Sequence, residues 1–572
     1  MVKLSIDGCS VEVIEGTTVL EAARLAGISI PTLCELKDLN LIASCRVCIV
    51  EIEGNGALCA ACNTVVNEGM TVRTNTPRVV AARRGNVEAI LSQHRSACTS
   101  CVRVKTCALR KLAEDLAVGE SVVSMPAKGA WDASFPLQRD ESKCIKCMRC
   151  VAICEKVQHC AVWDRAGVGP STGVVVKYGL GIDEAGCALC GQCITHCPTG
   201  ALTARDDIGY VLDAILDPEV MTVVQVAPAV RASWGEDVGV SRENATPGRL
   251  ASALRALGFD RVFDTDFAAD LTIMEEGSEF LEFIGSDKPR PMLTSCCPSW
   301  VRFAKLHFPN YVDRLSSAKS PHQMLGALVK NTMREEAEAS GKKKLFVVSI
   351  MPCVAKKYEA DVPELSTEGG ADVDAVLTVR EFDRMLHLFG VDCAALEETA
   401  FDNPLGLSTG AGTIFGRTGG VMEAALRTAA TILTGEPASL EACSCISATP
   451  ETPWMAKELD VAGTKVRIAV ASGLANTAKL LNALDAGEVE FDFVEIMACP
   501  GGCVNGGGQP IRFNTEQAAE RAQVLDTLDA ADTLRMSHDN PDIQKLYDEV
   551  LEKPLSHRSH EWLHTDQETW NI

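Results

Sequence analysis

Cysteine is the residue type that dominates the possible chemistry of this sequence. The chain has 572 residues and 26 cysteines, most of them in C-x2-C groups. The segment LTSCCPSW at 293–300 places two of them, Cys296 and Cys297, side by side. Adjacent cysteines form only a strained disulfide, and neighbouring side chains on an extended chain point in opposite directions. We therefore expect the two thiols to have different roles.

The spacing of the other cysteines favours metal over disulfides. The N-terminus, MVKLSIDGCSVEVIEG, has no apolar leader segment, and no later stretch has 18 uninterrupted apolar residues. We therefore expect a soluble, cytoplasmic protein whose thiols stay reduced and bind metal. Zinc is the simplest alternative for an isolated four-cysteine site. The net charge of -23 argues against nucleic acid as a partner.

Two runs have the spacing C-x2-C-x2-C-x3-C, namely CIKCMRCVAIC at 144–154 and CALCGQCITHC at 187–197. This is the pattern of a bacterial ferredoxin with two 4Fe–4S clusters, in which the fourth cysteine of each run ligates the other cluster. The runs therefore predict two ligand sets: Cys144, Cys147, Cys150 and Cys197, and Cys187, Cys190, Cys193 and Cys154. Cys160 is then a bystander.

The N-terminal segment predicts a small β-rich module. VKLSI, the turn Asp7–Gly8 and VEVI form a hairpin signature, and Thr17 or Thr18 can cap a helix that ends near Gly27. The cysteines that follow resemble those of a plant-type 2Fe–2S ferredoxin. The expected ligands are Cys34, Cys45, Cys48 and Cys62, with Cys59 as a rival for the last position.

A further cysteine group, HRSACTSCVRVKTC, contains one histidine. A site with one histidine and three thiols could hold zinc. The H-x3-C-x2-C-x5-C spacing instead resembles a 4Fe–4S module found in hydrogenases and respiratory complex I. The expected ligands are His94, Cys98, Cys101 and Cys107.

From residue 211 onwards, strand-like apolar runs alternate with helical ones. This alternation predicts an α/β domain with a largely parallel sheet. Cys296–Cys297, Cys353 and Cys499 each follow a predicted strand, at the edge where such sheets bind ligands. We therefore expect one shared site. The charged C-terminal segment predicts a helical tail, and its three histidines (His557, His560 and His564) are interpreted as structural.

Together these patterns predict a multidomain α/β protein with five parts. They are a β-grasp 2Fe–2S ferredoxin-like domain at 1–78, a His/Cys3 4Fe–4S domain at 79–118, a two-cluster ferredoxin domain at 135–210, a large α/β domain at 211–511 and a helical small-subunit-like segment at 512–572.

Three motifs of the large domain carry a family resemblance: TSCCPSW at 294–300, MPCVAKKYE at 351–359 and EIMACPGGCVNGGGQP at 495–510. They resemble the three signatures of the FeFe hydrogenases, and the order of all accessory cluster motifs agrees with the clostridial-type layout. The resemblance implies the reaction 2H⁺ + 2e⁻ ⇌ H₂ at an H-cluster, a 4Fe–4S cubane joined to a two-iron centre that carries CO, cyanide and a dithiolate. It also implies three further 4Fe–4S clusters and one 2Fe–2S cluster.

The resemblance also implies roles for individual residues. The cubane ligands would be Cys297, Cys353, Cys499 and Cys503. A proton relay would run through Cys296, Glu276, Ser316 and Glu279, and Lys356 would hydrogen-bond a cyanide. Ala227, Pro228 and Ala229 would line the pocket with Ser320 nearby, and Met351 and Met497 would pack against the cluster. The glycines around Cys503 would let the backbone approach the cofactor.

The N-terminal motif LCELKDLNLIASCRVCIVEIEG at 33–54 is similar to that of hydrogenase subunits of NAD(P)-linked and electron-bifurcating complexes. The expected partners are ferredoxin, flavoprotein NAD(P)-binding subunits and hydrogenase maturation proteins. Residues 71–111 carry nine basic side chains against one acidic residue, Glu88. We hypothesise that this stretch forms part of a docking surface for an acidic electron carrier or partner subunit, which charge reversal at Arg103 and Lys105 would test. The alternative functions for the whole chain are those of a complex I-like electron-transfer subunit and of a hydrogen sensor without turnover.

Overall fold

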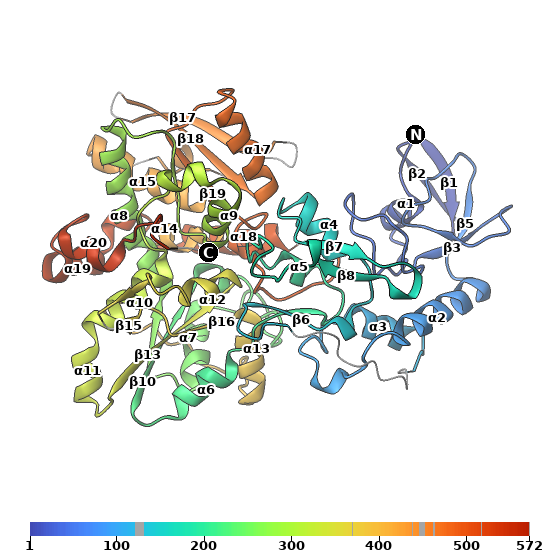
Figure 1. The fold of residues 1–572 in the computed structure, drawn as a ribbon, viewed down its shortest axis with the longest axis horizontal. Coiled ribbons are helices and arrows are strands. Elements are labelled where there is room, and N and C mark those ends of the chain that lie inside the picture. Colours follow the sequence, from blue (N-terminus) through green and yellow to red (C-terminus); the bar gives the residue numbers. More distant parts are fainter. Residues whose placement is uncertain are drawn as a thin grey trace.

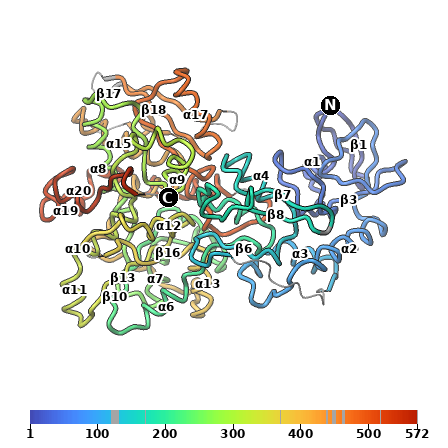
Figure 2. Tube along the Cα trace, viewed as in Figure 1, coloured from blue at the N-terminus to red at the C-terminus, as the bar shows by residue number. Residues whose placement is uncertain are grey.

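The computed structural model describes residues 1–119, 131–368, 370–436, 439–445, 452–461, 464–515, 517–570 and 572. The molecule is elongated (Figure 1). The N-terminal module lies at one end, a small module of residues 131–204 lies in the middle, and the large domain forms the other end. The tube in Figure 2 shows the same order along the chain.

The N-terminal module is a five-stranded sheet with the order β2-β1-β5-β3-β4. The predicted hairpin is present, and Asp7 and Gly8 both have positive φ, as a tight two-residue turn requires. Thr18 caps the first helix by accepting a hydrogen bond from the Glu21 backbone N–H. The elements are β1 (Val2–Ile6), β2 (Cys9–Val13), α1 (Val19–Leu25), β3 (Ile49–Ile52), β4 (Cys59–Ala60) and β5 (Thr71–Arg73).

Two helices and a compact module connect this sheet to the large domain. The helices are α2 (Pro77–Leu91) and α3 (Ala108–Asp115). The compact module has two short antiparallel strand pairs, β6–β9 and β7–β8. Its elements are β6 (Leu137–Arg139), α4 (Arg149–Lys156), β7 (Trp163–Ala166), β8 (Gly173–Val176), α5 (Gln192–Thr195) and β9 (Leu202–Ala204).

The large domain contains two four-stranded sheets rather than one. The first, β11-β10-β13-β16, is parallel throughout, and the second, β12-β19-β18-β17, is parallel except for the edge pair β17–β18. Every residue of β10 is buried, as expected for a strand covered on both faces. The strands are β10 (Val220–Val226), β11 (Arg261–Asp264), β12 (Met292–Leu293), β13 (Lys344–Met351), β16 (Ala375–Thr378), β17 (Trp454–Val461), β18 (Thr464–Ser472) and β19 (Phe493–Met497).

Helices cover both sheets, and the longest of them, α8, is almost entirely buried in its first half. Contacts join α8 to α10, α14 and α15. The helices are α6 (Ile208–Leu216), α7 (Pro247–Ala256), α8 (Thr265–Ile284), α9 (Pro298–His307), α10 (Pro321–Thr332), α11 (Arg334–Ala339), α12 (Ala355–Ala360), α13 (Val379–Leu388), α14 (Gly410–Thr413), α15 (Gly420–Thr434), α16 (Leu440–Cys443) and α17 (Leu474–Asp485). A short hairpin, β14 (Ser366–Thr367) and β15 (Gly370–Ala371), completes the domain.

The C-terminal segment is helical, as predicted, and packs on the large domain. Its helices are α18 (Ala518–Ala531), α19 (Pro541–Leu546) and α20 (His557–Leu563). Helix α18 contacts α14, and α20 contacts α10. His557 and His560 are exposed, but His564 is buried. In the described part of the chain, no helix has the length and apolar character needed to cross a membrane.

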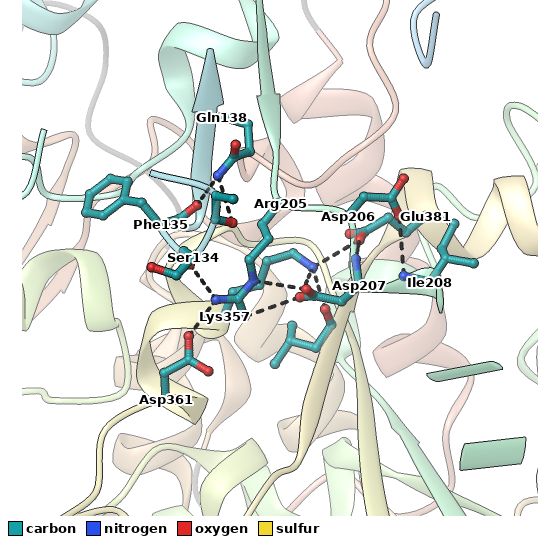
Figure 3. Close-up of polar contacts among 12 residues, drawn as sticks. Ser134, Phe135, Gln138, Arg205, Asp206, Asp207, Ile208, Lys357, Asp361 and Glu381 are labelled. Carbon is teal, nitrogen blue, oxygen red and sulfur yellow. Dashed lines mark hydrogen bonds and ion pairs between the residues drawn. The ribbon is translucent and has the colours of Figure 1, made fainter. Parts of the chain in front are cut away.

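A buried lysine holds the compact module against the large domain (Figure 3). The Nζ of Lys357 donates to Asp207 Oδ2 at 2.7 Å and to Glu381 Oε1 at 3.0 Å. Arg205 pairs with Asp207 and reaches Asp361 at 2.7 Å. Because Lys357 has no exposed side-chain surface, these carboxylates are needed to compensate its buried charge.

Candidate active site

Three strand ends and one glycine-rich loop bring the signature cysteines together. Strand β12 ends just before Cys296, β13 ends two residues before Cys353, and β19 ends two residues before Cys499. The prediction that these cysteines follow strands is therefore confirmed. The strands come from both sheets, so the site lies where the carboxyl edges of two sheets meet. A cavity of about 620 Å³ opens there.

The lining of this cavity is mostly apolar, apart from its thiols and a few polar groups. It contains residues from all three signatures and from the loops after β10 and β11. They include Ala227, Pro228, Ala229, Thr265, Cys296, Cys297, Pro321, His322, Met351, Cys353, Lys356, Phe415, Val421, Met497 and Cys503.

Four thiols lie near one another at this cavity. Cys499 interacts electrostatically with Cys297, Cys353 and Cys503. Burial raises the pKa of all four thiols. Thiolates can persist here only beside compensating positive charge, which bound iron would provide. Soft sulfur donors in a dry pocket are the ligands that iron–sulfur clusters prefer, so these residues fit such a group.

Cys296 faces a different neighbour from Cys297. After burial, the largest influence on its thiol is the carboxyl group of Glu276, and both effects raise the pKa of Cys296. The Nζ of Lys356 donates to the Cys296 carbonyl at 3.2 Å. The structure therefore separates the two adjacent thiols, one toward a buried carboxyl group and the other toward three further thiols.

A line of polar groups continues from Glu276 along α8. Burial raises the pKa of Glu276 to about 8, and the nearby charge of Glu279 adds to this shift. One carboxyl oxygen of Glu276, Oε2, is buried without a hydrogen-bond partner. The hydroxyl of Ser316 donates to Glu279 Oε2 at 2.7 Å. The four residues of the expected relay therefore follow one another in space from the cavity to the outer part of α8, in the order Cys296, Glu276, Ser316 and Glu279.

Glu359 is a site residue that the sequence analysis did not single out. Its Oε2 accepts hydrogen bonds from Lys356 at 2.7 Å and Ser320 at 2.9 Å, and from His322. Lys356 and His322 hold the pKa of Glu359 well below its usual range, whereas burial lowers that of His322. An ionised Glu359 thus orients Lys356. Its position three residues after Lys356 on one helix was the available signal.

The residues expected at the pocket lie at or beside the cavity. Ala227, Pro228, Ala229, Met351 and Met497 line it. Ser320 lies nearby and donates its hydroxyl hydrogen to Glu359.

The glycines after Cys503 allow close packing of the protein's own backbone. A Cβ on Gly506 would lie 2.2 Å from the carbonyl oxygen of Pro352. A Cβ on Gly507 would lie 2.5 Å from the Cα of Gly191 in the compact module. These glycines therefore allow backbone to pack against backbone, between signatures and between modules, a role that the sequence analysis did not include.

The two ferredoxin-type runs exchange their fourth cysteines as the spacing predicted. Cys144, Cys147, Cys150 and Cys197 line one cavity of about 420 Å³. Cys154, Cys187, Cys190 and Cys193 line another of about 380 Å³, which Cys160 also borders. The thiol of Cys160 donates to the Gln158 carbonyl at 3.1 Å. Among the described residues, no three His, Cys, Asp or Glu side chains converge on a single-ion site.

The second of these cavities adjoins the large domain. The thiol of Cys499 lies 3.8 Å from the Cys190 carbonyl oxygen. Gln192 donates to the Asn505 carbonyl at 2.8 Å. The compact module therefore touches the signature loop that carries Cys499 and Cys503.

The N-terminal thiols form two close pairs, Cys34 with Cys45 and Cys48 with Cys62. Charge interactions between Cys45 and Cys62 connect the pairs. The rival, Cys59, instead contacts Asn55 at 3.3 Å. This arrangement favours Cys62 as the fourth member of the set.

A buried asparagine links the N-terminal module to the compact one. The Nδ2 of Asn40 donates to the carbonyl oxygens of Cys34 at 2.6 Å and Cys147 at 2.9 Å. The imidazole Nδ1 of His94 lies 3.0 Å from the Lys143 carbonyl oxygen, next to the same module. Burial lowers the pKa of His94, and the Nδ1 contact leaves Nε2 available to a metal. Cys101 and Cys107 interact electrostatically in the loop that follows.

Arg103, one of the nine basic side chains at 71–111, is buried, whereas the docking hypothesis requires it to be exposed. Arg103 is 2 % exposed, and its guanidinium bonds to Thr106 and to the Ile194 carbonyl. Arg83 is also buried, whereas Lys105 Nζ lies 2.8 Å from His387 Nε2. Arg103 therefore fixes the His94 loop to the compact module and cannot meet a carrier.

Sequence comparisons agree with this arrangement over the whole chain. The family described as "Iron only hydrogenase large subunit, C-terminal domain" matches residues 220–507. Four further family descriptions match: a 2Fe-2S iron-sulfur cluster binding domain at 1–77, an NADH-ubiquinone oxidoreductase-G iron-sulfur binding region at 83–121, a 4Fe-4S dicluster domain at 143–201 and an iron hydrogenase small subunit at 515–567. The chain belongs to the FeFe hydrogenases.

Individual relatives support the same assignment. The chain is 45% identical to the NADP-reducing hydrogenase subunit HndD of Solidesulfovibrio fructosivorans, over 99% of this chain and 98% of that protein. It is 37% identical to iron hydrogenase 1 of Clostridium pasteurianum, over 99% of each chain. A solved variant of apo FeFe-hydrogenase HydA1 from Chlamydomonas reinhardtii is 40% identical, covers 63% of this chain and 98% of its own, and has a TM-score of 0.56.

The protein is therefore an FeFe hydrogenase with accessory iron–sulfur domains. As a member of this family it interconverts H₂ with protons and electrons. Its large domain is the H-cluster domain, and the matched 2Fe–2S and 4Fe–4S domains precede it in the chain.

Proposed function

We propose that this chain is the hydrogen-converting subunit of an NADP-reducing hydrogenase complex. The observation that carries the catalytic part is the position of Cys296, between a thiol-lined cavity and the buried Glu276. The partner part rests on the relative HndD, an NADP-reducing hydrogenase subunit, which this chain matches over 99% of its length.

The proposed H-cluster ligands are Cys297, Cys353, Cys499 and Cys503. The cofactor supplies the metal site at which H₂ is formed or split. The protein supplies its position and polarity. Lys356, oriented by Glu359, places an ammonium group at the cavity wall. Met351, Met497 and the segment Ala227–Ala229 exclude water from this wall.

The proposed proton relay begins at Cys296, whose thiol can give or accept a proton at the cavity wall, as a ligated thiolate cannot. Glu276 exchanges that proton through its unpaired Oε2. Ser316 then connects Glu276 to Glu279, since its hydroxyl both neighbours Glu276 and donates to Glu279. A buried carboxyl group with a pKa of about 8 is suited to this task because it can be protonated or ionised near neutral pH.

The proposed electron route uses one 2Fe–2S cluster and three 4Fe–4S clusters besides the H-cluster. The N-terminal thiols and the His94 set both adjoin the module of Cys144 and Cys197, through Asn40 and Lys143 respectively. The route then passes to the set that contains Cys190, which adjoins Cys499. Two branches therefore meet before the large domain, in five modules with the boundaries predicted from the sequence.

The proposed electron acceptor is a flavoprotein subunit that binds NADP(H), with ferredoxin as a second candidate partner, and hydrogenase maturation proteins supply the two-iron centre. The test is to mature the chain anaerobically and to follow H₂-driven reduction of viologen dye, of ferredoxin and of NADP⁺. We expect the isolated chain to reduce the dye only. Direct reduction of ferredoxin would contradict the need for a partner subunit, and failure to reduce the dye despite a spectroscopically assembled H-cluster would contradict the catalytic assignment.

A further inference from the structure

Ser317 lies between the last carboxylate of the proposed relay and a histidine of the C-terminal segment. Its hydroxyl oxygen is 2.9 Å from Glu279 Oε1 and 2.8 Å from His564 Nδ1. The backbone N–H of Ser317 also donates to Glu279, at 3.1 Å to Oε1. The serine is thus held in contact with both groups at once.

His564 is fixed from its other side. Its Nε2 lies 3.0 Å from Glu275 Oε2, and Glu275 Oε1 accepts a hydrogen bond from the Tyr547 hydroxyl at 2.6 Å. The Leu555 backbone N–H also donates to Glu275. Burial would raise the pKa of Glu275, yet the hydrogen bonds from His564 and Tyr547 hold it below its usual value. An ionised Glu275 therefore accepts the Nε2 proton of His564 and leaves Nδ1 as the acceptor that faces Ser317.

This geometry allows two complete hydrogen-bond arrangements. They hold the same number of protons and differ by the net transfer of one proton from Glu279 to His564. In the first, protonated Glu279 donates to Ser317 and Ser317 donates to the neutral imidazole. In the second, the His564 imidazolium donates to Ser317 and Ser317 donates to the Glu279 carboxylate. Going from the first to the second breaks one O–H bond at Glu279 and forms one N–H bond at His564 Nδ1. The serine loses one hydrogen and gains one.

Other ionisable groups face this histidine from the elements packed around it. Glu275 belongs to α8 and Tyr547 to the segment after α19, whereas Glu279 and Glu282 of α8 interact with the neighbouring His560. The exposed ring of His560 on α20 has its centroid 4.5 Å from that of His564. The imidazole of His564 therefore has the Glu275 carboxylate at its Nε2 and the exposed ring of His560 beside it.

We propose that His564 is a further proton-accepting residue of this hydrogenase, reached from Glu279 through the hydroxyl of Ser317. The inference rests on the proposed relay as far as Glu279 and extends it into the C-terminal segment. It also assigns a role to that segment, because His564 lies within residues 515–567, the part that matches the iron hydrogenase small subunit.

The test compares holoenzyme variants in dye-coupled H₂ oxidation over a range of pH. His564→Gln can keep hydrogen bonds to Ser317 and Glu275 but cannot carry the proton. We expect His564→Gln, His564→Ala and Ser317→Ala each to lower turnover by about tenfold, a smaller loss than for an acid or base at the reacting atoms. Ser317→Thr retains the hydroxyl and should remain close to wild type. Imidazole in solution should restore turnover to His564→Ala.

His557→Ala is the matched control, because His557 is exposed at the start of α20, the helix that ends just before His564. It should leave turnover and the pH profile unchanged. Wild-type turnover in His564→Gln, or a loss in His564→Ala that imidazole does not restore and that follows a lowered melting temperature, would overturn the proposal in favour of a structural role. Glu279→Ala is measured in parallel. If that variant keeps full turnover, the proposed relay itself fails, whereas loss in Glu279→Ala with normal His564 variants rejects only the extension.

Discussion

Lys357 and Asp207 are 150 positions apart in the sequence, yet the Lys357 Nζ lies 2.7 Å from Asp207 Oδ2. The same ammonium group contacts Glu381 at 3.0 Å. Lys357→Met should lower stability by about 3–5 kcal/mol, because two buried carboxylates lose their counter-charge. The readout is the midpoint of thermal inactivation. Lys343→Met removes an exposed lysine paired with Glu219 and should change that midpoint little. Equal shifts of the midpoint in both variants would show that the burial of Lys357 does not determine its contribution to stability.

The pair Cys296 and Cys297 makes the sharpest prediction about the active site. Cys296→Ala should retain its iron but lose turnover by on the order of 10²–10⁴-fold, the range for a positioned acid or base. Cys297→Ala should lose iron from the large domain. Iron content and dye-coupled H₂ oxidation measured on the same preparations separate the two effects. Loss of iron in both variants would mean that the two thiols share one role.

Glu276 predicts an unusual dependence of stability on pH. Its pKa is about 8 in the fold against an ordinary value of 4.5. Between these values the folded chain binds a proton that the unfolded chain has released, so stability falls as pH rises through this window. Glu276→Gln cannot ionise and should gain roughly 5 kcal/mol relative to wild type above that window, while losing turnover.

Melting temperature against pH measures this difference. Glu282→Gln is the control, since Glu282 is exposed on the same helix, and its curve should match that of the wild type. Parallel curves for Glu276→Gln and wild type would contradict a raised pKa at Glu276.

Two cysteines compete for the last position of the N-terminal cluster, and they can be distinguished by substitution. Cys62→Ser should abolish the 2Fe–2S signal in electron paramagnetic resonance, because Cys62 pairs with Cys48. Cys59→Ser should leave that signal intact, since the hydrogen-bond partners of the Cys59 thiol are Asn55 and the neighbouring Ala57 carbonyl rather than another cysteine. The reverse result would move the ligand to Cys59.

Asn40 connects the backbone of Cys34 to that of Cys147. Asn40→Ala leaves two buried carbonyl groups without a donor, which costs about 1–3 kcal/mol locally. The N-terminal module should then bind the compact module less tightly. H₂-driven reduction of its 2Fe–2S cluster, followed by freeze-quench spectroscopy, should be several-fold slower. Asn86→Ala removes an exposed hydrogen bond to the Arg46 carbonyl and should leave the rate unchanged. A rate unaffected by Asn40→Ala would show that this contact does not set the electron path.

The sequence was informative wherever chemistry is encoded by local spacing. The exchanged cysteines of the two ferredoxin-type runs, the hairpin at Asp7–Gly8 and the strands before Cys353 and Cys499 all follow from short-range patterns. The division into two sheets could not be predicted, because the alternation of strands and helices does not say which strands pair.

Residues that act through distant partners were also missed or misjudged. Nothing near Arg103 indicates that its side chain is buried against Ile194, since that contact joins two modules. His564 resembles an ordinary surface histidine until Ser317 and Glu275 are seen around it, 247 and 289 positions away. Glu359 was within reach, because helical spacing places it beside Lys356.

The close approach of Gly191 and Gly507 has a consequence for attempts to exchange parts of this enzyme. The modules resemble a set of interchangeable cassettes, but at this point their main chains are in van der Waals contact with no side chain between them. A side chain at either position would push the compact module away from the large domain. A chimaera that joins this catalytic domain to a foreign electron donor must therefore reproduce this direct contact between main chains, as well as a linker of suitable length.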